Sequence, residues 1–247
     1  MTAPDLVDTR GAAAPQRWSR AAWIVVLLGA AYAVLAALLG DRSGSSVLWP
    51  LDLLLMLVFA GGLWWRGCLG WDARRRLSRR GAAVAFIIGS WLTAMLYELS
   101  LRTGATGFGG LHANTATSFL LAQGFYVPLA VGGWLLARRY GYSAEDVFWT
   151  GALAALYEML TAGVVTLMGQ PSLWPLAPLL GGYYLTVYGY CLALPWLFLD
   201  ERDLWRHPPH LIARRRKVLY GLLLGPACWL VFVGWAWLVA WLVAWLG

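Results

Sequence analysis

The sequence predicts an all-α fold: a polytopic integral membrane bundle of about seven transmembrane helices, with the N-terminus in the cytoplasm and the C-terminus outside. Three observations lead to this prediction. Apolar residues occupy 60% of the 247 positions and the mean hydropathy is +0.62, which is too apolar for a soluble domain of this size. Apolar runs of about 20 residues recur, and each can cross a hydrocarbon core as a helix. Arginine and lysine gather in alternate gaps between these runs.

The predicted elements follow from the N-terminus onward. Residues 1–20 are polar and rich in Ala and Pro, which is typical of a flexible tail, here a cytoplasmic one. Residues 21–247 form the transmembrane domain. Its predicted spans are 21–40, 47–65, 81–101, 117–137, 147–168, 177–199 and 218–246. The first span lacks a small-residue cleavage pattern, so we expect a retained anchor. The last would be about 43 Å long as a straight helix, so we expect tilt or a kink at Gly225-Pro226.

The basic residues predict the orientation. Seventeen of the nineteen lie in the N-terminal tail or in the gaps after the second, fourth and sixth spans, and only Arg42 and Arg102 lie in the others. Short loops rich in Arg and Lys stay in the cytoplasm. The same residues can pair with anionic lipid headgroups, so the net charge of +7 requires no nucleic-acid partner. We therefore expect a multi-pass protein of the plasma membrane whose partners are membrane lipids.

Two glutamates are the first candidate site residues. Glu158 falls near the middle of the fifth span, where a carboxylate that faces lipid is costly. No Arg or Lys lies in the middle of any span, so Glu158 is expected to face the bundle, with polar partners or a bound proton. Glu98 lies nearer the outer end of the third span. Arg102, one helical turn further on, offers it an ion pair and therefore a purely structural role.

A short internal similarity adds Tyr157 to the candidate site. Residues 94–99 (AMLYEL) resemble residues 154–159 (AALYEM), sixty positions later. The two segments would run in the same direction, as in a parallel repeat of the hairpins made by spans three–four and five–six. Chance similarity is the alternative, because the match is short and rich in Ala and Leu.

Polar groups in spans four and six complete the candidate site. Tyr184 and Tyr188 share one face of a glycine-rich helix whose glycines allow close helix packing. Their hydroxyls would hold a proton or line a polar path, or else the rings only pack. Gln123 lies one turn from Pro128, and a proline in a membrane helix frees a backbone carbonyl and favours a polar pocket.

Tryptophan is the remaining signal. Trp237, Trp241 and Trp245 recur every four residues, and they predict either a lipid-facing rim or a contact surface for another membrane subunit. The three cysteines, Cys68, Cys191 and Cys228, have no paired spacing and are expected to be free thiols. Two cytoplasmic histidines without a third ligand predict no metal site, and no motif calls for a cofactor.

Three functions fit these features. The first is a small transporter or binding protein that uses Glu158 to couple protons or a cation to a site beside span six. The second is a membrane-embedded enzyme acting on a lipid or isoprenoid, with Glu158 as general acid, and the third is an accessory subunit of a membrane complex. HExxH, GxSG, aspartate-rich boxes and a lysine within the last span are all missing, which argues against intramembrane proteases, prenyltransferases and retinal proteins. The sequence leaves open whether any reaction is catalysed and which substrate is bound.

Overall fold

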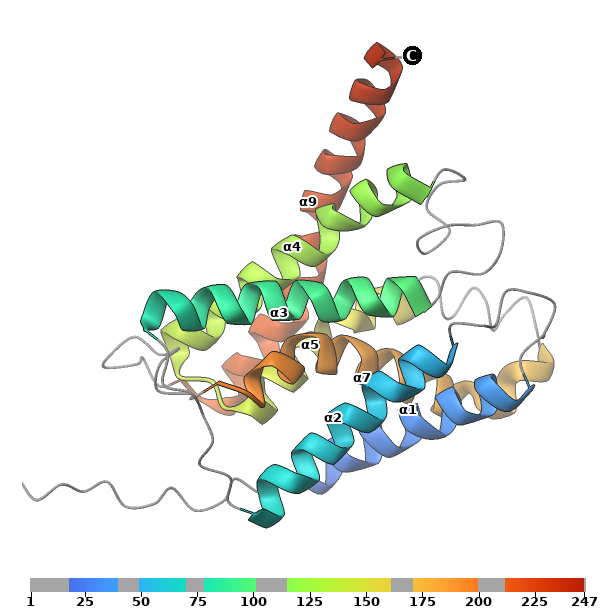
Figure 1. The fold of residues 1–247 in the computed structure, drawn as a ribbon, viewed down its shortest axis with the longest axis vertical. Coiled ribbons are helices and arrows are strands. Elements are labelled where there is room, and N and C mark those ends of the chain that lie inside the picture. The colour runs from blue at the N-terminus through green and yellow to red at the C-terminus, as the bar shows by residue number, and fades with distance from the viewer. Residues whose placement is uncertain are drawn as a thin grey trace, which may run out of the picture.

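The computed structural model describes residues 18–39, 49–69, 78–100, 115–160, 171–199 and 212–246. Its elements are α1 (Arg20–Leu39), α2 (Trp49–Leu69), α3 (Arg79–Ser100), α4 (Thr115–Tyr140), α5 (Ala144–Glu158), the 3₁₀ helix η3 (Pro171–Leu176), α7 (Ala177–Trp196) and α9 (Arg214–Leu246) (Figure 1). The all-helical class is confirmed. The described part of the chain contains seven α-helices, and each begins within four residues of a predicted span.

Within the described residues, three segments are long and apolar enough to cross a membrane: Arg80–Glu98 in α3, Ala116–Tyr140 in α4 and Arg214–Trp245 in α9. Shorter apolar stretches lie in α1 (Arg20–Leu35) and α2 (Leu53–Trp64). These features are those of a membrane protein.

The fifth helix differs from the predicted span 147–168. α5 ends at Glu158, and Met159 and Leu160 follow in a wider π-helical turn. The remainder of that span lies outside the described residues. The chain re-enters α7 through η3, whose Pro171 and Pro175 favour a short, tight helix over a continued α-helix.

α7 lies at the centre of the bundle and packs most extensively against α5 and α1. Glycines permit this, as the sequence predicts. A Cβ on Gly151 of α5 would lie 2.2 Å from the carbonyl oxygen of Tyr188 in α7, so the two backbones are almost in contact. Gly29 of α1 meets Gly182 and Thr186 of α7 in the same way. The Thr186 hydroxyl donates to the carbonyl of Val25 at 2.9 Å.

Contacts at one end of the bundle bring together the beginnings of α1, α5 and α9 and the end of α4. The backbone N–H of Ser19 donates to Glu145 at 3.0 Å, and Lys217 pairs with Asp146 at 2.6 Å. Trp18 packs against Phe148, with ring centroids 5.2 Å apart. The predicted tail therefore docks at its last residues. The arginines at the beginnings of α1 and α9 and at the end of α4 share this end of the bundle.

The C-terminal turns of α9 extend beyond the other helices. It is one helix from Arg214 to Leu246 that passes through Pro226, and its C-terminal part projects beyond the bundle (Figure 1). The indole N–H of Trp235 donates to the carbonyl of Leu120 in α4 at 2.6 Å. Beyond it, Trp237, Trp241 and Trp245 are 77%, 61% and 73% exposed. Cys191 and Cys228 are buried free thiols, as predicted, and the side chain of Cys68 lies outside the described residues.

Candidate functional site

Glu98 is a buried carboxyl group inside the bundle. The inward face of α3 carries Ser90, Thr93, Ala94, Tyr97 and Glu98, a helical spacing that aims all five at the neighbouring helices. Glu98 is only 7% exposed and accepts a hydrogen bond from the hydroxyl of Tyr126 in α4. A carboxyl group removed from water in this way is costly to ionise unless its neighbours stabilise the charge.

Aromatic rings enclose this hydrogen bond. We define the aromatic cluster as Tyr97 of α3, Phe125 and Tyr126 of α4, and Tyr183 and Tyr188 of α7. Each of the five is at most 7% exposed. Tyr188 occupies the centre: its ring lies 6.2 Å from that of Tyr126, in a stacked arrangement, 5.8 Å from Phe125 and 6.4 Å from Tyr97. The cluster therefore joins three helices around one carboxyl group.

Gln123 holds α3 and α4 together. Its amide nitrogen donates to the carbonyl of Phe119 at 2.8 Å, and its oxygen accepts from the indole of Trp91 at 2.5 Å. Pro128 lies within α4, which continues through it as a helix. Gln123 therefore donates within α4 and accepts from α3, one turn from Tyr126.

Trp229 lies between the aromatic cluster and Tyr157, one of the two candidate site residues of the fifth span. Tyr157 is 44% exposed and packs on the Trp229 ring at 5.7 Å, and that ring packs on Phe125 at the same distance. Glu158 is the last residue of α5, and its side chain lies outside the description. Tyr157 and its equivalent in the proposed repeat, Tyr97, therefore have different surroundings, and the repeat stays a prediction.

The remaining predicted tyrosines divide between core and periphery. Tyr188 is at the centre of the cluster. Tyr184 is half-buried, and its ring lies 6.1 Å from that of Tyr183. Sequence reasoning selected Glu98 and Tyr188 but did not include Tyr126. The signal was its spacing: Tyr126 follows Gln123 by three residues and therefore lies near it on the same side of one helix.

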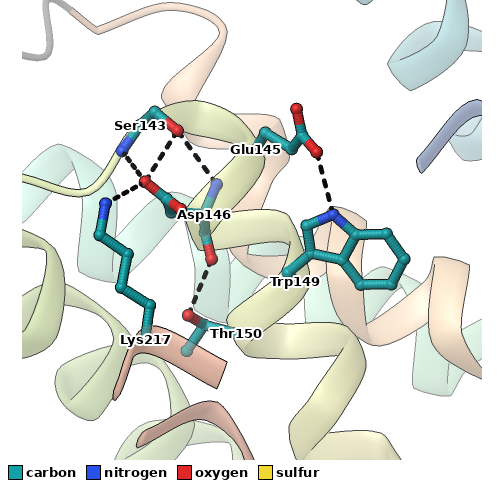
Figure 2. A network of polar contacts seen from close by, with 6 residues as sticks. All are labelled: Ser143, Glu145, Asp146, Trp149, Thr150 and Lys217. Carbon is teal, nitrogen blue, oxygen red and sulfur yellow. Dashed lines mark hydrogen bonds and ion pairs between the residues drawn. The ribbon is translucent and has the colours of Figure 1, made fainter. Parts of the chain in front are cut away.

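A second polar network lies where α5 begins, beside the first turn of α9 (Figure 2). Ser143 caps α5: its hydroxyl accepts from the backbone N–H of Asp146 at 3.2 Å, and the Asp146 carboxylate accepts from the Ser143 N–H at 3.0 Å. The same carboxylate oxygen accepts a hydrogen bond from the Lys217 ammonium of α9. Glu145 accepts from the Trp149 indole at 3.1 Å. The capping-box pattern of Ser143 and Asp146, similar to S-x-x-E, was the sequence signal for this end.

Tyr142 lies beneath this network in the turn between α4 and α5. Its side chain is fully buried, and the Lys217 ammonium lies 5.0 Å from its ring centroid. Burial raises the pKa of the Tyr142 phenol, and the negative charge of Asp146 raises it further. The turn itself needs Gly141, which has a φ of 59°.

The geometry therefore presents one buried acid with a phenol donor among three helices, and one ion-paired network that joins helix ends. No protein-family model, curated protein or solved structure matches this chain.

Proposed function

We propose that this chain is a multi-pass plasma-membrane protein, a small transporter or binding protein whose buried carboxyl group takes up and releases a proton. The observation that supports this proposal is the hydrogen bond between Glu98 and Tyr126 inside the aromatic cluster. The proposal moves the principal role from Glu158 to Glu98, because Glu98 is the carboxyl group with a described, buried environment.

Proton binding at Glu98 would change the hydrogen bonds of its carboxyl group as well as its charge. A protonated carboxyl group removes the cost of a buried negative charge and changes which oxygen atoms accept hydrogen bonds. Tyr126 would have to adjust its hydroxyl, and its ring is stacked on Tyr188. A rearrangement at the carboxyl group would therefore reach α4 and α7 together, and coupled transport requires such a link between ion binding and helix packing.

Glu158 enters this proposal as a second carboxyl group. It follows Tyr157, which reaches the aromatic cluster through Trp229 and Phe125. A proton exchanged between two such sites would cross the bundle between α3 and α5. The two glutamates are separable experimentally, because they lie on different helices.

The test measures proton binding directly and needs no substrate. Purified protein in lipid vesicles is titrated with pH while infrared difference spectra record the carbonyl stretch of a protonated carboxyl group. Glu98→Gln should remove that band, and Tyr126→Phe should shift the pH at which it develops. Tyr220→Phe is the matched control, a phenol in the first turns of α9 whose ring stacks on Tyr140, and it should leave the band unchanged.

A companion measurement follows charge displacement after a pH jump in the same vesicles. The wild-type protein should give a transient current that Glu98→Gln abolishes. A full band and current in Glu98→Gln would refute the assignment. Their loss in Glu158→Gln alone would place the proton site in the fifth helix.

One observation favours a second function, that of an accessory subunit. The stripe made by Trp237, Trp241 and Trp245 lies on the part of α9 that projects from the bundle (Figure 1). Under this alternative, Trp241→Ala should weaken the co-purification of a membrane partner in mild detergent. Glu98→Gln should leave that co-purification intact.

A further inference from the structure

Five exposed arginines meet where α4 ends and α9 begins. We define the basic end as Arg138, Arg139, Arg214, Arg215 and Arg216, all of which are exposed. The two helix ends are joined by the stacked rings of Tyr140 and Tyr220, whose centroids are 5.2 Å apart. Arg139 and Arg216 both lie near enough to Tyr220 to interact with it electrostatically. Guanidinium groups from two helices therefore flank one aromatic pair.

The two described carboxylates nearest these arginines are held by other partners. Asp146 is bound by Lys217 and Ser143, and Glu145 accepts from Trp149 and from the backbone of Ser19. Within the described residues, no ion pair involves a member of the basic end. No described acidic side chain therefore competes with an external anion for these five positive charges.

Aromatic rings next to the arginines indicate where these residues would lie relative to a bilayer surface. The Arg138 guanidinium lies 5.2 Å from the centroid of the Trp134 ring, and that of Arg139 lies 5.6 Å from the Tyr140 ring. Tryptophan and tyrosine favour the boundary between hydrocarbon and headgroups. The arginines lie at the ends of two helices that are long and apolar enough to cross a membrane. In a bilayer we therefore expect them at the level of the lipid phosphates.

Exposed apolar side chains continue from the arginines into the membrane-spanning part. Leu135 of α4 and Leu219 and Leu223 of α9 are 50%, 50% and 55% exposed. A ligand that used both surfaces would carry a negative headgroup and hydrocarbon chains. Free phosphate would use only the first surface.

We infer that the basic end binds an anionic phospholipid, with its phosphate held by Arg139 and Arg216 and its acyl chains along Leu135, Leu219 and Leu223. Paired guanidinium groups suit phosphate because they donate in a fixed, planar geometry. This interaction is independent of proton binding at Glu98.

The test uses the full chain in detergent, titrated with phosphatidylglycerol or phosphatidylcholine, with bound lipid counted by native mass spectrometry. Phosphatidylglycerol should bind more tightly. The double variant Arg139→Gln/Arg216→Gln should lower its affinity by roughly thirty-fold, taking a loss of about five-fold for each arginine that binds the phosphate directly. Inorganic phosphate should not displace the lipid.

The matched control is Arg20→Gln/Arg80→Gln, which removes two exposed arginines from the beginnings of α1 and α3. This variant loses the same net charge and should keep wild-type affinity. Equal losses in the two double variants would overturn the proposal in favour of a general charge effect. Equal binding of phosphatidylcholine, or displacement by inorganic phosphate, would also overturn it. Protection of Cys191 and Cys228 from a thiol reagent verifies that each variant is folded.

Discussion

The close approach of α5 and α7 makes Gly151→Ala the sharpest test of the packing. The added methyl group would lie 2.2 Å from the Tyr188 carbonyl oxygen and 3.2 Å from the Cα of Gly189. Both are backbone atoms, so no side chain can rotate away. The two helices would have to separate by about 1 Å to restore ordinary contact distances.

The magnitude follows from two opposing effects. Alanine is intrinsically better than glycine inside a helix by about 1 kcal/mol. Forcing extra volume into a packed interface costs about 1–3 kcal/mol, and a clash between backbones belongs at the upper end of that range. We therefore expect Gly151→Ala to destabilise the protein by about 2 kcal/mol. The control is Gly61→Ala in α2, where nothing lies within 4 Å of the added methyl group. It should stabilise the protein by up to about 1 kcal/mol.

The protein supplies its own reporter for the assay. Cys191 and Cys228 are buried, so a thiol-reactive dye labels them only when the bundle opens. Heating in detergent, on a Cys68→Ser background, should show an apparent Tm lower by about 4–8 °C for Gly151→Ala. If Gly151→Ala and Gly61→Ala raised the apparent Tm alike, the α5–α7 approach described here would be wrong.

Three further outcomes are expected. Lys217→Met leaves the partly buried Asp146 carboxylate without its cation and should lower the free energy of unfolding by about 1–2 kcal/mol, measured by thermal unfolding. Adding Asp146→Asn, which keeps an oxygen acceptor for the helix cap, should restore part of that stability. Because the pKa of Tyr142 is raised in the folded protein, its contribution to stability is present below about pH 10 and is lost as the pH rises further; Tyr142→Phe should flatten the decline in apparent Tm above that pH, and an unchanged decline would contradict the burial. Trp235→Phe removes the hydrogen bond to the Leu120 carbonyl and should cost about 1 kcal/mol, measured as faster hydrogen exchange where α4 meets α9.

The candidate site was predictable in its residue types and not in its pairings. Glu98 and Tyr188 stand out because polar groups are expensive inside apolar segments, and this expense is a local property that composition reveals. Arg102 was the expected alternative partner of Glu98, and it lies outside the described residues. The partner that the structure describes, Tyr126, is on another helix, and no spacing within one helix indicates which neighbour lies opposite.

The sequence by itself determined that the fold is helical, where the seven described α-helices begin to within four residues, and which ends carry the arginines. It could do so because apolar length and charge act within each segment. Tertiary structure decided the rest. It placed α7 at the centre through glycines such as Gly151 and Gly182, and it brought Glu98 against Tyr126. It also left the last turns of α9 outside the bundle (Figure 1). These outcomes depend on which helix surfaces fit together, and that fit comes from the shapes of two segments at once.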